Sequence, residues 1–185
     1  MDNGASSYRR YLDGDDTGLT EIIKYYKDGL VLYINTYVKN IFVAEDLMEE
    51  TFYKLAVKKP RFNGKSSFKT WLYTIGRNVT VDYLRKNSRN SYLPIEDFAN
   101  YIEEESNVEI EHLKKEQKIL LHRTMRKLKE EYLQVLYLIY FEDFSNEETA
   151  KIMKKSRRQI ENLIYRAKNT LKTELKKEGF EYENL

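Results

Sequence analysis

The sequence predicts an all-α protein made of two small helical domains joined by an acidic linker. Apolar residues recur at intervals of three and four over most of the chain, which is the spacing of one helix face. Prolines and glycines, which interrupt helices, number only 2 and 7 among 185 residues. Two capping patterns close together, at residues 145–148 and 156–159, predict a helix-turn-helix in the second domain.

The first domain is expected to span residues 1–90. After a short N-terminal helix, the spacing predicts a long helix from Ile22 to Ile41, which Asn40 is expected to close. Further helices are expected at residues 44–57 and 67–86, with a basic loop between them that contains Pro60. Trp71 lies on the apolar stripe of the last helix, so we expect it to anchor the core.

The linker and the second domain follow. Residues 91–111 contain Pro94, few large apolar side chains and a run of acids, which is typical of a linker. Helical spacing returns from Leu113 to Leu128 and from Tyr132 to Tyr140, so the second domain is expected to span residues 112–185.

The helix-turn-helix is predicted from its two helix starts. Ser145 with Glu148, and Ser156 with Gln159, fit the capping box, in which serine accepts from a first-turn amide and Glu or Gln reaches back. The first helix then has room for about three turns. The second runs from Gln159 to about Leu175, and its expected buried stripe is Ile160, Ile164 or Leu163, Ala167 and Leu171.

The composition excludes several classes of site. The chain has no cysteine, so disulfides, thiolate zinc sites and cysteine nucleophiles are excluded. His112 and His122 have no partner at a ligand spacing, and we expect no metal, no cofactor and no enzymatic activity. No apolar run reaches the roughly 20 residues that span a bilayer, and residues 1–16 lack a signal-peptide core, so a cytoplasmic location is expected.

Charge is strongly segregated although the net charge is only +2. Residues 58–90 carry net +8, residues 151–177 carry net +8, and residues 94–111 between them carry −7. Two basic segments predict two contacts with a polyanion. In the second segment the outward positions of the helix carry amide and guanidinium groups, which pair with adenine and guanine edges in a major groove.

Two stretches of the first half carry a resemblance to a known family. Residues 44–52 read AEDLMEETF, residues 68–78 read FKTWLYTIGRN, and residues 81–85 read VDYLR. Together they resemble region 2 of bacterial RNA polymerase sigma factors of the extracytoplasmic-function type. Residues 128–144 and 148–171 resemble region 4 of the same family. The resemblance covers nearly the whole chain.

The resemblance implies a function and its partners. It implies a sigma factor that binds core RNA polymerase, recognises promoter DNA and promotes strand opening. The expected partners are the largest-subunit coiled coil and the flap region of the polymerase, promoter DNA and an anti-sigma factor. The residues implied to bind the core polymerase are Glu45, Asp46, Glu49 and Glu50. Those implied for the minus-ten element are Lys65, Ser66, Lys69, Arg77, Asn78, Arg85 and Lys86.

For the minus-thirty-five element, the resemblance implies major-groove binding by the second helix of the helix-turn-helix. The residues are Arg157, Arg158, Gln159, Glu161, Asn162, Tyr165, Arg166 and Lys168. Glu161, Asn162, Tyr165 and Arg166 are expected to face bases, whereas Arg157, Arg158 and Lys168 are expected to hold phosphates. The chain departs from the family pattern at Lys154, Lys155, Glu161 and Leu163.

Two alternatives remain open at the level of sequence. A helix-turn-helix regulator that acts without polymerase would also explain the C-terminal motif. The acidic linker is either a solvated tether or, by resemblance, a segment that threads the polymerase cleft in place of nucleic acid.

Overall fold

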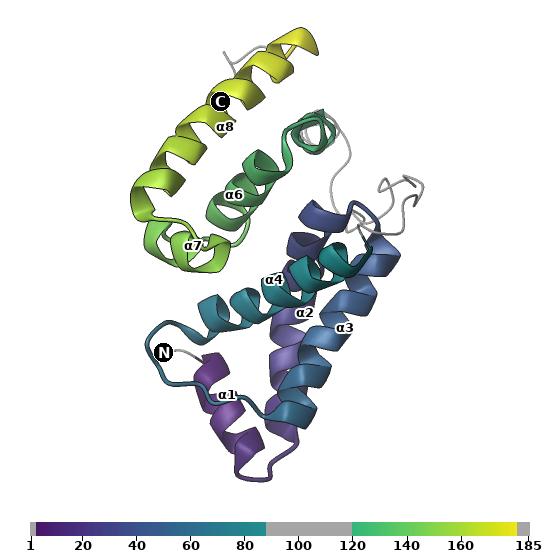
Figure 1. Ribbon diagram of the computed structural model, residues 1–185, viewed down its shortest axis with the longest axis vertical. Helices are drawn as coiled ribbons and strands as arrows, with labels where there is room; N and C mark the ends of the chain where they lie inside the picture. The colour runs from purple at the N-terminus through teal and green to yellow at the C-terminus, as the bar shows by residue number, and fades with distance from the viewer. Residues whose placement is uncertain (1–2, 88–119, 181–185) are drawn as a thin grey trace, which may run out of the picture.

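The computed structural model describes residues 3–87 and 120–180, and every regular element within these ranges is a helix (Figure 1). The predicted all-α class is therefore confirmed. The predicted linker at residues 91–111, the domain boundaries on either side of it and His112 lie outside the described residues.

The first group of helices is built around α2. It consists of α1 (Asn3–Leu12), α2 (Thr17–Val38), α3 (Ile41–Lys58) and α4 (Phe68–Asn87). Helix α2 packs against the other three, and its Leu30, Tyr33 and Ile34 are completely buried. The apolar stripes that the sequence predicted in this half form one side of each interface.

Asn40 has a different role from the one predicted. It begins α3 rather than ending α2, because its side chain accepts a hydrogen bond from the amide of Val43 at 3.2 Å. Helix α2 ends at Val38, and Lys39 takes the left-handed conformation with φ of 53°. Apolar spacing continues across this break to Ile41, which is why the spacing predicts a first long helix that extends past Val38.

An aromatic cluster fixes the basic loop that precedes α4. Phe62 in the loop contacts Phe68 and Trp71, with ring centroids 5.6 and 5.2 Å apart. Tyr8 of α1 packs on the same two rings and donates a hydrogen bond to the carbonyl of Pro60 at 2.8 Å. Trp71 is half-buried inside this cluster, as predicted, and the cluster holds the loop against the domain.

The second group contains a helical segment at residues 120–126, then α6 (Glu130–Tyr140), α7 (Asn146–Met153) and α8 (Arg157–Lys177). Both predicted capping boxes are present, at Ser145 with Glu148 and at Ser156 with Gln159. Helix α7 has 8 residues, about two turns rather than the predicted three. Of the two alternatives for the stripe of α8, Leu163 is the buried residue, whereas Ile164 is only partly buried.

The two groups are in contact. Helix α7 packs on α4, and α6 packs on α2, so that the first helix of the helix-turn-helix lies beside the first half of α4 while α8 leads away from it (Figure 1). No helix in the described part of the chain is long and apolar enough to cross a membrane.

Candidate functional site

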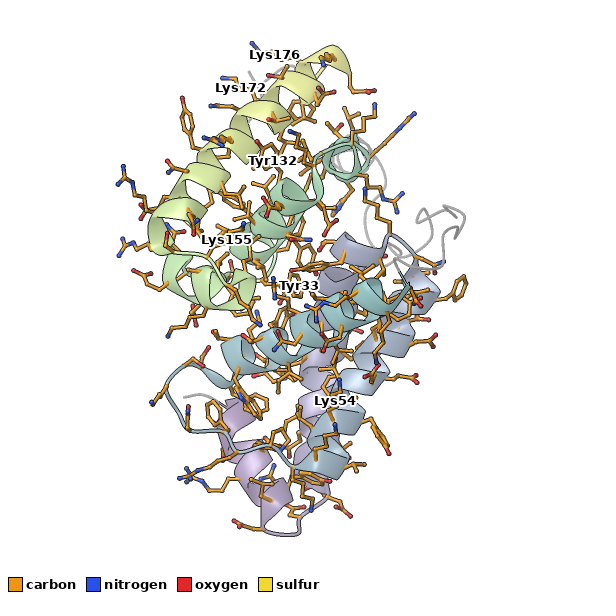
Figure 2. All side chains as sticks on the ribbon, in the orientation of Figure 1. Tyr33, Lys54, Tyr132, Lys155, Lys172 and Lys176 are labelled. Carbon is orange, nitrogen blue, oxygen red and sulfur yellow. The ribbon has the colours of Figure 1, made fainter. Side chains whose placement is uncertain are left out.

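The outer face of α3 combines acids with large apolar side chains. Asp46, Glu49 and Glu50 are exposed along one side of this helix, and Glu50 is paired with Lys54 at 2.9 Å. Figure 2 shows Lys54 on the same helix. Glu45 is only partly exposed and lies at the edge of this side.

Three apolar residues of that face were not predicted to be functional. Phe42, Tyr53 and Val57 are 67%, 62% and 59% exposed. Tyr53 and Val57 follow Phe42 by 11 and 15 residues, which are close to whole numbers of helical turns. All three therefore lie on the same stripe of α3 as the acids. The spacing was visible in the sequence, but large apolar side chains at helical spacing are ordinarily expected to face the core. We call these six residues (Phe42, Asp46, Glu49, Glu50, Tyr53 and Val57) the α3 face.

The seven residues predicted for the minus-ten element do not form one patch. They follow the basic loop and the whole length of α4, which is about 30 Å at 1.5 Å per residue. Lys65 is exposed in the loop, and Arg85 and Lys86 are exposed in the last turn of α4. Ser66 and Asn78 are partly exposed.

Lys69 and Arg77 are engaged with other side chains. The Lys69 ammonium lies 2.9 Å from the Glu142 carboxylate and 4.7 Å from the centre of the Phe144 ring, so it is covered by the turn between α6 and α7. Arg77 is partly buried beside Tyr37, and its Nε has no hydrogen-bond partner. On an ideal helix Asn78 and Arg85 lie roughly 160–180° around the axis from Lys69.

Buried tyrosines surround this part of α4. Burial, followed by the nearby Glu142 carboxylate, raises the pKa of Tyr73 and of Tyr137 well above the ordinary value. Both hydroxyls therefore remain protonated and act as hydrogen-bond donors. Tyr33, which Figure 2 shows between the two groups of helices, packs on Tyr73 with ring centroids 5.4 Å apart.

The outer side of α8 presents the residues predicted to read the minus-thirty-five element. All eight are exposed, and Tyr165 is 70% exposed. A shallow hollow of about 240 Å³ lies on this side, lined by Lys155, Gln159, Asn162, Leu163 and Arg166. Figure 2 shows Lys155 where α8 begins and Lys172 and Lys176 toward its other end.

Several of these side chains have partners within the chain. Arg157 donates to Glu161 at 2.9 Å and also pairs with Glu147. The Gln159 carbonyl accepts from the Ser156 amide as part of the cap, and Lys168 lies over the Tyr140 ring at 4.9 Å. These are exposed contacts, which a phosphate can replace at small cost.

The helix-turn-helix turn contains a strained residue. Lys154 adopts the left-handed conformation with φ of 55° and ψ of 46°, and its amide closes the end of α7. Lys155 then pairs with Glu131 of α6 at 2.7 Å, which fixes the turn to the helix behind it. Among the described residues, no group of three or more His, Asp or Glu side chains could hold a metal ion.

Comparison with known proteins matches both halves of the chain. The family model described as Sigma-70 region 2 matches residues 22–90, and that described as Sigma-70, region 4 matches residues 118–171, about two thirds of the chain together. The chain is 26% identical over 160 residues to RNA polymerase sigma factor YlaC of Bacillus subtilis, covering 86% of this chain and 92% of the relative. It is 25% identical over 171 residues to ECF RNA polymerase sigma factor SigW of the same organism, covering 88% and 91%.

A solved structure has a similar fold. The sigma factor RpoE from Bartonella quintana, crystallised in complex with the anti-sigma factor NepR, aligns with a TM-score of 0.68 and 24% identity. The alignment covers 85% of this chain and 96% of that one. A match to region 2 as well as region 4 favours a sigma factor over a regulator that acts without polymerase. The chain belongs to the extracytoplasmic-function type of RNA polymerase sigma factors with sigma-70 regions 2 and 4; it directs RNA polymerase to promoters and is not an enzyme.

Proposed function

We propose that three separate surfaces of this chain divide the work of promoter recognition. The α3 face binds the coiled coil of the polymerase largest subunit, the loop before α4 and α4 itself bind and open the minus-ten element, and α8 reads the minus-thirty-five element as duplex. The observation that carries this proposal is the arrangement of two basic surfaces on different groups of helices, together with an acidic and apolar face on a third surface.

The chemistry of the α3 face suits a protein partner. Apolar side chains more than half exposed in a row are unfavourable in water and supply the buried core of an interface. The acids beside them would pair with basic residues of the partner and favour one orientation. With only Lys54 as a neighbouring base along this stretch, the face is unsuited to nucleic acid.

The basic loop and α4 suit single-stranded DNA. Opening a duplex requires cations that hold the backbone and polar or aromatic surfaces that capture bases. Lys65, Arg85 and Lys86 are exposed cations, while Ser66 and Asn78 are polar groups beside them. Lys69 and Arg77 are engaged within the chain, and Lys69 lies on the side of α4 opposite to Asn78 and Arg85, so the exposed residues carry this role.

The second group of helices suits duplex DNA on one side and protein on another. Asn162 and Arg166 line the hollow of α8, where their amide and guanidinium groups can meet base edges. Tyr140 and Phe141, 49% and 40% exposed, offer an apolar surface to the polymerase flap region. We further propose that an anti-sigma factor binds this chain. We also propose that this chain acts in the cytoplasm and that its two domains are residues 1–90 and 112–185.

The α3 face is tested by comparing two exposed tyrosines on different helices. Tyr53→Ala removes an aromatic side chain from the α3 face, whereas Tyr25→Ala removes one that is 74% exposed on α2. We expect Tyr53→Ala to weaken binding to core polymerase at least about 30-fold, the effect of losing a hot-spot residue worth about 2 kcal/mol, and Tyr25→Ala to leave it unchanged. Equal affinities for the two variants would place the polymerase on another surface.

Strand opening is tested by permanganate footprinting of a promoter bound by the reconstituted holoenzyme. Reactive thymines around the minus-ten element are expected with the wild-type chain, and fewer with Lys65→Ala combined with Arg85→Ala. Unchanged reactivity in that variant would remove the loop and α4 from the opening step.

A further inference from the structure

The hollow on the outer side of α8 has an apolar floor. Its volume is about 240 Å³, and its lining combines two amides, two cations and one leucine. Leu163 belongs to the buried stripe of α8 and is only 9% exposed, but it also lines the hollow. The polar side chains around it are Lys155, Gln159, Asn162 and Arg166. The hollow therefore offers an apolar contact at its bottom and hydrogen bonds at its rim.

The capping box of α8 decides which end of the Gln159 amide is available to a ligand. The Ser156 backbone amide can only donate, and it donates to the Gln159 side-chain oxygen at 2.7 Å. The Gln159 backbone amide donates in turn to the Ser156 hydroxyl at 3.2 Å, which completes the box. Because the cap holds the oxygen, Gln159 presents its NH2 group to the hollow, and this group is a donor.

The donor of Gln159 and the apolar side chain of Leu163 are neighbours on the helix surface. Residues four positions apart lie one turn from each other, with Cβ atoms about 5–6 Å apart. One ligand can therefore meet both side chains at once. Such a ligand carries a hydrogen-bond acceptor and an apolar group side by side.

One base of the major groove has this combination. Thymine presents its O4 acceptor and its C5-methyl group on neighbouring ring atoms, whereas cytosine presents an amino donor and no methyl group. The cytosine amino group would meet the Gln159 NH2 group donor against donor. Guanine offers the acceptors O6 and N7 but no apolar group. We propose that the hollow is a thymine-selective site, in which Gln159 donates to O4 and Leu163 packs on the methyl group.

This inference rests on the duplex-reading role proposed above for α8, and it adds two residues to those that read bases. Asn162 and Arg166 line the same hollow and are placed to read neighbouring base pairs. Lys155 lies 2.7 Å from the Glu131 carboxylate of α6, so the rim of the hollow is tied to the helix behind it. Figure 2 shows Lys155 at the start of α8.

Four bases separate the two contacts without any change to the protein. The holoenzyme, reconstituted from the full chain and core polymerase, first selects its upstream duplex element from a random library. Each thymine of that element is then replaced in turn by deoxyuridine, cytosine or 5-methylcytosine. Deoxyuridine keeps O4 and lacks the methyl group, cytosine lacks both, and 5-methylcytosine has the methyl group alone. Thymine and deoxyuridine both pair with adenine, and the two cytosines both pair with guanine, so each methyl comparison keeps the opposite base.

At one thymine position we expect deoxyuridine to bind about fourfold more weakly than thymine, since about 0.8 kcal/mol is lost when one methyl group returns to water. At the same position 5-methylcytosine should bind about fourfold more tightly than cytosine. In the complex of the chain with this duplex, a nuclear Overhauser effect should connect the thymine methyl group to the methyl groups of Leu163. An element without thymine, the absence of any methyl effect, or a methyl effect without this connection would overturn the role of Leu163.

Gln159→Glu removes the donor and keeps the cap. Glutamate already closes the box of α7, where the Glu148 carboxylate accepts from the Ser145 amide at 3.1 Å. Since a carboxylate only accepts, the variant should shift the ratio of thymine to cytosine affinity at that position at least about fivefold toward cytosine. This ratio cancels the general repulsion between the added charge and DNA. Asn169→Asp is the matched control, because it adds the same charge at an exposed position of α8 outside the hollow and should leave the ratio unchanged.

The failure of this inference differs from the failure of the proposed function. An unchanged ratio in Gln159→Glu, or the same shift in Asn169→Asp, would overturn the role of Gln159 although α8 reads duplex DNA. If the holoenzyme selects no upstream element from the library, the duplex-reading role of α8 is contradicted, and the thymine site is overturned with it.

Discussion

Replacing Arg166 by alanine should remove sequence discrimination by the helix-turn-helix. Arg166 is exposed on α8 and lines the hollow together with Asn162. Among the described residues, its guanidinium forms no hydrogen bond or ion pair that DNA binding would have to break. A guanidinium bidentate to guanine contributes about 1–3 kcal/mol of discrimination, which is roughly 5- to 150-fold in affinity. Arg166→Ala should therefore weaken binding to the preferred duplex by that factor and bind other duplexes almost as before.

Arg157→Ala is the informative comparison. Arg157 is held by Glu147 and Glu161 at the start of α8, so it is placed to exchange these partners for a phosphate. Its loss should weaken binding to all duplexes to a similar extent and reduce the slope of log affinity against log salt by about 0.9. The two variants can thus be told apart: Arg166→Ala should change the preference for one DNA sequence, and Arg157→Ala should change the salt dependence of binding.

The assay begins with selection of preferred duplexes from a random library by the wild-type chain. Affinities of both variants for the selected and a scrambled duplex are then measured by fluorescence anisotropy at several salt concentrations. If Arg166→Ala weakens the selected and scrambled duplexes equally, Arg166 binds phosphate, and the assignment of the hollow as the base-reading site is refuted.

Three further predictions concern stability and can be checked by calorimetry. Lys154→Gly should stabilise the protein by about 0.5–1 kcal/mol, because it removes a left-handed lysine; a loss of stability would contradict this. Ser156→Ala should destabilise it by about 1 kcal/mol through loss of the α8 cap, and an unchanged melting temperature would show that the cap contributes nothing. Burial favours a higher pKa for Glu148, but hydrogen bonds, first from Ser145 and then from Ser67 and Thr70, outweigh it and lower the pKa. A lowered folded-state pKa gives stability that is complete above the unfolded value of about 4.3 and is lost as pH falls through the folded value. The melting temperature of Glu148→Gln should therefore lie below that of the wild type at pH 7 and approach it below about pH 4, whereas a gap that persists in acid would argue against this origin.

Local signals in the sequence predicted the helices and the helix-turn-helix. The caps at Ser145 and Ser156 involve residues three positions apart, so their chemistry is visible in a short window. The left-handed conformation of Lys39 was not predictable, because glycine is the residue that usually marks such a helix end and helical spacing continues past Lys39. That is why the boundary between α2 and α3 was misplaced while both helices were recognised.

The candidate site was predicted less completely, because part of it depends on distant contacts. Lys69 was predicted to be a cation for DNA, but its partner Glu142 lies 73 residues further along the chain and was not predicted. Phe42 and Tyr53 were overlooked because an apolar side chain at helical spacing is usually buried, and only the packing of α2 and α4 on the opposite side of α3 decides otherwise. On α8 the predicted buried stripe is almost correct. The residues predicted to face outward are therefore the ones found exposed.

The most direct test is transcription from a library of promoter fragments by bacterial core polymerase with and without the purified chain. Defined start sites are expected only when both are present, each preceded at a constant spacing by the same two sequence elements. Absence of any start site that depends on the chain, although it is folded and core polymerase is active, would contradict the conclusion that this protein directs polymerase to promoters.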